Sequence, residues 1–281
     1  MRILILGGYG VFGGRLARLL SDQVAVTLII AGRSEAKAAA FCAQLSGSAK
    51  RMALALDRTG DLAPALAQVA PDLVVDASGP FQTYGAAPYR VVEACLVQGC
   101  DYMDLADGAD FVAGVARFNE TAIAKGVTIL SGVSTCPVLT TAAVRALCDD
   151  MDQIKGVAAG IGPSPYSGVG LNVVRALTGY AGKPLTMSGK PALIETRMAV
   201  IAPPGRLPLN PRLFAVVDTP DSVILPRLFP GIGEVWFGPW TRTHGESDRG
   251  RGRVSQGWQR RAVACRVLSS GRRGDLDANF R

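Results

Sequence analysis

Short apolar stretches alternate with amphipathic ones along the first 130 residues of the chain. The apolar stretches predict buried strands at 3–6, 24–30, 52–56, 73–75, 101–105 and 127–130. Helical spacing predicts helices at 15–20, 35–44, 62–69 and 88–97, and an apolar helical face over 111–122. Strands that alternate with helices at this spacing are typical of an α/β fold with a Rossmann-like, doubly wound parallel sheet. Right-handed crossovers then bring all the strand ends to one edge, where ligands bind.

The alternation stops near Ser131, and a helix is expected to start at Cys136. Past Asp150, glycine and proline become dense, and 173–177 and 195–200 read as a helix and a strand. We therefore predict three parts: the parallel-sheet domain over 1–150, a second α+β domain over 151–240 for substrate binding or dimerisation, and a tail over 241–281. The tail has no apolar period, so we expect it to be largely disordered.

A glycine-rich turn joins the first strand to the first helix. The run Gly8-Tyr9-Gly10-Val11-Phe12-Gly13 fits the pattern G-x-G-x-x-G, and Gly7 extends it to a looser form. Glycine lets the backbone turn sharply and approach a pyrophosphate, while the helix start offers free N–H groups. We expect residues 7–13 to bind a dinucleotide. The alternative is a tight turn without a ligand.

The end of the second predicted strand favours NADP over NAD. An NAD site usually has Asp or Glu there, whereas this chain has Arg33 and Ser34. A guanidinium pairs with a 2′-phosphate and a serine hydroxyl donates to it. The alternative is a solvent-facing Arg33 beside a helix-capping Ser34, and the serine could serve both roles.

Further candidate residues follow the later strands. Asp57 is expected near the adenine or, equally, as a capping aspartate before Thr59. Ser78, Gly79 and Pro80 are expected to border the nicotinamide ribose, because small residues permit a close approach.

No catalytic residue is assigned by the sequence. Asp104 and Asp107 could transfer a proton, but turn and cap roles fit them better. Cys136 could be a thiolate at a helix start, or a small apolar filler. The only histidine, His244, falls in the tail, which argues against a Ser–His–Asp relay or a histidine metal site. No tyrosine has a lysine four residues later, which argues against a Tyr-x-x-x-Lys relay.

Composition and charge narrow the classes of protein. No apolar run approaches the roughly 18 residues of a membrane span. The six cysteines form no Cys-x-x-Cys pair, so we expect no metal site, no disulfide framework and a reducing, cytoplasmic location. Most of the net charge of +7 lies in 241–281, which holds ten arginines and four acidic residues. Few aromatic residues lie among these arginines, so nucleic-acid binding is not favoured.

Four of these stretches together resemble the NADP-binding domain of the saccharopine dehydrogenase family. They are 3–14, 31–34, 74–81 and 100–105, within a similarity that covers Met1 to about Val144. The resemblance implies a Rossmann-like fold, NADP as cofactor, and contacts at Gly7, Gly10, Gly13, Arg33, Ser34, Ser78, Gly79 and Pro80. It implies no catalytic residue. The second half resembles bacterial members of the family rather than the lysine-pathway enzymes.

The resemblance implies an NADP-dependent oxidoreductase that transfers a hydride to or from a C–N bond (imine or amine) or a carbonyl-derived substrate. The partners expected are a small-molecule substrate and a second copy of the chain in a homodimer, with no membrane. The similarity to family members ends near Gly238, where the arginine-rich segment begins. We interpret this as a truncation or a change of reading frame near that residue. The alternatives are a non-catalytic NADP-binding regulatory protein and an inactive truncated homologue.

Overall fold

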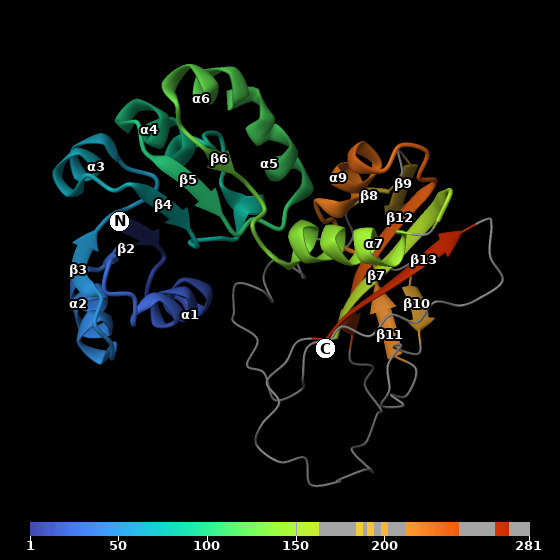
Figure 1. Ribbon diagram of the computed structural model, residues 1–281, viewed down its shortest axis with the longest axis horizontal. Helices are drawn as coiled ribbons and strands as arrows, with labels where there is room; N and C mark the ends of the chain where they lie inside the picture. Colours follow the sequence, from blue (N-terminus) through green and yellow to red (C-terminus); the bar gives the residue numbers. More distant parts are fainter. Residues whose placement is uncertain are drawn as a thin grey trace, which may run out of the picture. The chain divides into compact units, whose positions relative to one another are not determined.

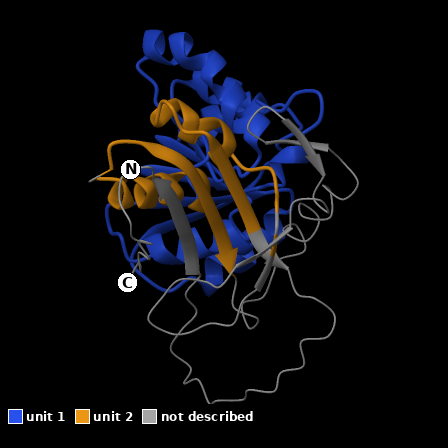
Figure 2. Cartoon of the chain, turned by 90° about the vertical axis from the view of Figure 1, so that its right-hand side faces the viewer, with its two compact units in different colours: residues 1–134 blue, residues 135–281 orange. Residues whose placement is uncertain are grey.

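The computed structural model describes residues 1–149, 151–162, 184–187, 190–193, 198–201, 212–241 and 262–269. The chain divides into two compact units, Met1–Ser134 and Thr135–Arg281 (Figures 1 and 2). The sequence predicts the end of the first domain at residue 150. The structure assigns the helix before that point to the second unit, because Ala143, Val144 and Leu147 pack in the second unit's core.

The first unit is built on a six-stranded parallel sheet in the order β3-β2-β1-β4-β5-β6 (Figure 1). Its strands are β1 (Arg2–Leu6), β2 (Thr27–Gly32), β3 (Lys50–Ala55), β4 (Leu73–Asp76), β5 (Asp101–Asp104) and β6 (Ile129–Leu130). Leu4 of β1 lies beside Ile29 of β2 on one side and Val74 of β4 on the other. From β1, the chain adds β2 and β3 on one side of the sheet and β4, β5 and β6 on the other. This arrangement confirms the predicted doubly wound, Rossmann-like sheet.

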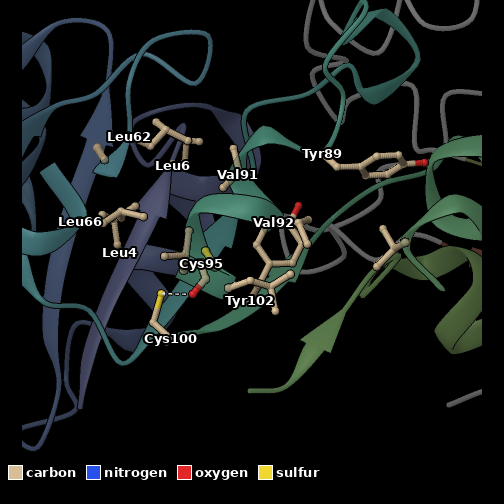
Figure 3. Close-up of a cluster of buried hydrophobic side chains, with 14 of the residues drawn as sticks. Leu4, Leu6, Leu62, Leu66, Tyr89, Val91, Val92, Cys95, Cys100 and Tyr102 are labelled. Carbon is tan, nitrogen blue, oxygen red and sulfur yellow. Dashed lines mark hydrogen bonds between the residues drawn. The ribbon is translucent and has the colours of Figure 1, made fainter. Parts of the chain in front are cut away.

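Two layers of helices cover the sheet because its apolar strands are buried on both faces. Ile3 and Ile5 pack with α1 (Val11–Leu20) and α2 (Glu35–Gln44). Leu4 and Leu6 point to the opposite face, shown in Figure 3, and pack in one core cluster with Val92 and Tyr102. That face is covered by the remaining helices of the unit: α3 (Ala63–Val69), η1 (Phe81–Thr83), α4 (Arg90–Gln98), α5 (Ala109–Gly114), η2 (Val115–Phe118) and α6 (Asn119–Lys125).

Several element ends differ from the sequence prediction. The first helix begins at Val11, so Gly13 and Gly14 lie inside it, and β2 begins at Thr27 instead of Val24. The helix predicted at 88–97 begins at Arg90. The apolar face over 111–122 is divided among α5, η2 and α6.

The second unit combines helices with a five-stranded mixed sheet. The helices among its described residues are η3 (Thr135–Leu139), α7 (Thr140–Leu147) and α9 (Asp221–Leu228). The sheet has the order β10-β11-β12-β7-β13, formed by β7 (Ile154–Gly162), β10 (Met198–Ile201), β11 (Arg212–Ala215), β12 (Glu234–Thr241) and β13 (Ala262–Ser269). A separate hairpin pairs β8 (Pro184–Met187) with β9 (Lys190–Leu193). The helix expected over 173–177 lies outside the described residues.

Strand β13 lies within the segment 241–281, for which the sequence predicts no packed structure. Ala262–Ser269 instead pairs antiparallel with β7 along almost its whole length. The run 262–268 is apolar apart from Arg266, so this part of the segment can join a sheet. The rest of 242–281 lies outside the described residues. Among the described residues, no helix has the length and apolar character needed to cross a bilayer.

Candidate functional site

The turn after β1 is held close to the neighbouring strands. The N–H groups of Gly7 and Gly8 donate to the carbonyl of Ala31 at the end of β2, at 2.9 and 3.1 Å. Gly7 has a φ of +76°, which favours glycine. A Cβ on Gly7 would also lie 2.8 Å from the Ala77 carbonyl and 2.9 Å from Ser78 Cα. The turn between strand and helix therefore requires glycine here.

Helix α1 approaches this turn closely through Gly13. A Cβ on Gly13 would collide with the Gly7 carbonyl oxygen and lie 2.9 Å from the Gly7 carbonyl carbon. No side chain caps the start of the helix at Gly10, and its first turn carries no acidic residue. The side chains of Val11 and Phe12 are exposed beside this helix start. A glycine cradle and an uncapped helix start fit a pyrophosphate, which accepts hydrogen bonds from the amides and is favoured by the helix dipole.

Tyr9 and Ser34 contact each other next to the end of β2. The Tyr9 ring lies against Gly32, where an added Cβ would be 2.6 Å from the ring. Its hydroxyl accepts a hydrogen bond from the Ser34 N–H at 3.2 Å. Ser34 Oγ accepts from the Lys37 N–H at 3.3 Å and thereby caps α2. Arg33, which lies between Gly32 and Ser34 in the sequence, is exposed. The capping role considered for Ser34 is present. Its exposed neighbour Arg33 directly follows β2, where the sequence predicts contact with the 2′-phosphate.

Asp57 takes the turn role that was the alternative to adenine contact. Its Oδ1 accepts hydrogen bonds from Thr59 N at 2.9 Å and Thr59 Oγ1 at 2.8 Å. These bonds hold the pKa of the Asp57 carboxyl below its usual value, and the charges of Arg33 and Arg58 act in the same direction. Asp57 is exposed, so its second oxygen can still receive a donor.

A buried polar network lies beneath Ser78 at the end of β4. Asp76 is fully buried and accepts hydrogen bonds on Oδ1 from Ser78 N at 2.9 Å and Ser78 Oγ at 2.6 Å. The Tyr84 hydroxyl is 3.1 Å from Asp76 Oδ2 and 2.8 Å from Ser78 Oγ. Burial raises the pKa of Asp76, and the hydrogen bonds from Ser78 and Tyr84 oppose that rise. Ser78 is thus the partly exposed end of a network whose other members are buried.

Gly79 and Pro80 complete this edge of the sheet. The Pro80 carbonyl accepts hydrogen bonds from Thr83 N at 3.2 Å and Thr83 Oγ1 at 3.0 Å, which starts the short helix η1. A Cβ on Gly79 would lie at an ordinary contact distance of 3.4 Å from Phe81, so the space at this position does not require glycine.

Asp104 ends β5 in register with Asp76 of β4. It is fully buried, and its Oδ1 accepts from Ala106 N at 2.9 Å and Gly132 N at 2.8 Å. Burial raises the pKa of its carboxyl. Asp107 Oδ1 accepts from Gln82 Nε2 at 2.9 Å. The backbone bonds of Asp104 favour its turn role over proton transfer, whereas Asp107 is paired with a side chain.

Cys136 is buried in the second unit's core, as an apolar filler would be.

The structure brings the glycine turn and Ser78 into contact, as the strand order requires. The sequence analysis missed Tyr84 and Arg58 as members of this edge and did not assign a role to Asp76. An aspartate at the end of an apolar strand is a signal for Asp76. No local pattern identifies Tyr84, which reaches the site through the packing of η1. Within the described residues, no group of three His, Cys, Asp or Glu side chains could hold a metal ion.

Comparison with known proteins adds two similar structures. Saccharopine dehydrogenase (L-Glu forming) from Saccharomyces cerevisiae matches with a TM-score of 0.59 and 18% identity, over 85% of this chain and 54% of that enzyme. The chain therefore spans about half the length of that enzyme. An amine dehydrogenase from Mycobacterium smegmatis matches with a TM-score of 0.51 and 13% identity, over 96% of this chain and 86% of that one. At these identities the matches establish the fold alone. No curated protein sequence matches significantly.

A family match identifies the first unit more closely. Residues 3–130 match the family described as "Saccharopine dehydrogenase NADP binding domain". The match spans all six strands of the parallel sheet and the glycine cradle, and it agrees with the resemblance found in the sequence. Residues 3–130 therefore belong to the saccharopine dehydrogenase NADP-binding domain family, and NADP is the cofactor of this unit.

Proposed function

We propose that this chain is an NADP-dependent oxidoreductase that moves a hydride to or from a C–N bond or a carbonyl-derived substrate. The observation that carries the proposal is the glycine cradle at the start of α1, inside a unit that belongs to an NADP-binding family. The two similar structures named above are both dehydrogenases, and one is an amine dehydrogenase. Their names favour a substrate that is an amine or becomes one.

The residues that would hold the cofactor lie along the carboxyl edge of the sheet. The glycine turn at 7–13 would let the pyrophosphate approach the amides at the start of α1, because the N–H groups of Gly7, Gly8 and Gly10 donate within the protein. Arg33 with Ser34 would bind the phosphorylated ribose. Ser78, Gly79 and Pro80 would border the nicotinamide ribose. When bound, NADP supplies or accepts the hydride. The chain's own part is to fix the cofactor.

Turnover with a substrate panel tests the proposal. The full chain is mixed with NADPH and with pairs of amines and keto acids, and NADPH absorbance is followed. We expect steady NADPH oxidation with at least one pair, and a much slower rate with NADH. NADPH binding without turnover for any pair would contradict the enzyme assignment and favour a regulatory NADP-binding protein. A folded chain that binds neither nucleotide would contradict both.

A further inference from the structure

Arg58 follows β3, and its guanidinium lies over the ring of Tyr84. Its Cζ is 3.1 Å from the ring centroid, and its Nη2 donates to the Tyr84 carbonyl at 3.2 Å. The Tyr84 side chain is only 8% exposed, whereas Arg58 is half-buried. The Tyr84 ring thus lies against the guanidinium, while the Arg58 residue keeps part of its surface exposed. In the described part of the chain, Nε and Nη1 of Arg58 have no hydrogen-bond partner.

The turn that carries Arg58 is fixed from both sides. Asp57 closes it by accepting from Thr59, and the Gly60 N–H donates to the Asp57 carbonyl at 3.0 Å. From α4, Arg90 Nη1 donates to the carbonyls of Thr59 and Gly60 at 3.0 and 3.3 Å. The guanidinium is thus held in place before any ligand arrives, which lowers the entropy lost on binding.

A chain of contacts connects Arg58 to the glycine cradle. A Cβ on Gly7 would lie 2.9 Å from Ser78 Cα, and Ser78 Oγ is 2.8 Å from the Tyr84 hydroxyl. The Tyr84 ring in turn lies under Arg58. Arg33, by contrast, directly follows β2, and its neighbour Ser34 donates its N–H to the Tyr9 hydroxyl. The two arginines therefore stand on different loops, Arg33 after β2 and Arg58 after β3.

We propose that Arg58 binds the pyrophosphate of the cofactor, together with the amides at the start of α1. The inference rests on the cofactor site proposed above and adds a residue that the glycine pattern does not predict. A fixed guanidinium with free N–H groups is suited to phosphate oxygens, because it can form paired, charge-assisted hydrogen bonds. The competing role is purely structural: Arg58 would cover Tyr84 and balance the buried carboxylate of Asp76, whose charge it stabilises.

Nucleotide titrations of Arg58→Met test the assignment. Methionine keeps an apolar stem against Tyr84 but removes the charge. We expect affinity for NADPH, NADH and ADP-ribose to fall by a similar factor of about tenfold or more, because all three contain the pyrophosphate. Adenosine, which has no phosphate, should bind equally to the variant and the wild type. Arg117→Met is the matched control, because Arg117 also lies over the ring of a buried tyrosine, Tyr89, at a longer Cζ–centroid distance of 4.9 Å. That control should keep wild-type affinity.

Several results would overturn the proposal. Unchanged affinity in a folded Arg58→Met variant would leave only the structural role. A loss for NADPH without a loss for NADH would move Arg58 to the 2′-phosphate, and an equal loss for adenosine would indicate purine stacking instead. If Arg58→Met alone fails to fold, Asp76→Asn is compared with Asp76→Asn/Arg58→Met, which leaves no unbalanced carboxylate. The same tenfold difference is expected there, and its absence would refute the proposal. A wild-type chain that binds no nucleotide would refute the cofactor site itself.

Discussion

Replacing Gly13 by alanine should disturb both the stability of the first unit and its cofactor site. The new methyl group would meet the backbone of Gly7 and lie 3.0 Å from Gly8 Cα, so no side chain can rotate away to make room. Helix α1 would have to move from the turn, although Ala17 anchors it with 0% exposure. Overpacking of this kind costs about 1–3 kcal/mol. Alanine recovers up to about 1 kcal/mol through its higher helix propensity. We therefore expect a net loss of about 1–2 kcal/mol in the free energy of unfolding.

Gly14→Ala is the matched control, because it lies in the same helix and gains the same propensity. Its Cβ would meet the Phe41 ring at 3.1 Å, and a side chain yields more readily than the backbone of a turn. Denaturant unfolding measures stability, and quenching of NADPH fluorescence measures affinity. Gly13→Ala should weaken NADPH binding at least tenfold, while Gly14→Ala should change it little. Wild-type stability and affinity in Gly13→Ala would refute the close packing of α1 on the turn.

Three further predictions concern single side chains. Arg33→Glu should weaken NADPH binding by on the order of 2 kcal/mol, because a charged hydrogen bond is lost, and should leave NADH binding nearly unchanged; equal NADPH affinity in a fluorescence titration would remove the assignment. Ser34→Ala removes the cap of α2 and should lower the free energy of unfolding by about 1 kcal/mol in a denaturant titration, whereas an unchanged midpoint would contradict the cap. Burial raises the pKa of Asp76, so the folded state binds that proton more tightly than the unfolded chain, and the contribution of Asp76 to stability falls as pH rises from about 4 through the raised pKa. The free energy of unfolding of Asp76→Asn should therefore increase relative to that of the wild type as the pH rises over this range. For Asp57→Asn this difference should change with pH in the opposite direction, because the pKa of Asp57 is lowered. The same direction of change in both variants would refute the reasoning.

The architecture of the first unit could be predicted because its signals are local. Each strand of a parallel sheet is buried on both faces, so runs such as Ile3–Leu6 are apolar throughout and stand out from the helices between them. The glycine pattern is equally local, since a positive φ at Gly7 and the approach of α1 at Gly13 leave no space for a side chain. Element ends were less accurate, because the same residues can continue a helix or a strand until packing decides.

Tertiary structure decided what depends on residues distant in the chain. The packing of η1 brings the Tyr84 hydroxyl to Asp76 and its ring under Arg58, 26 residues away, and no periodicity encodes that contact. The limit of the first unit at Ser134 likewise follows from the side chains that α7 packs against, not from its own helical pattern. The sequence by itself determined the parallel sheet and the glycine cradle, because burial and backbone geometry act on neighbouring residues. The tertiary structure alone decided which charged and polar side chains share the edge of that sheet, because this depends on where separate loops meet.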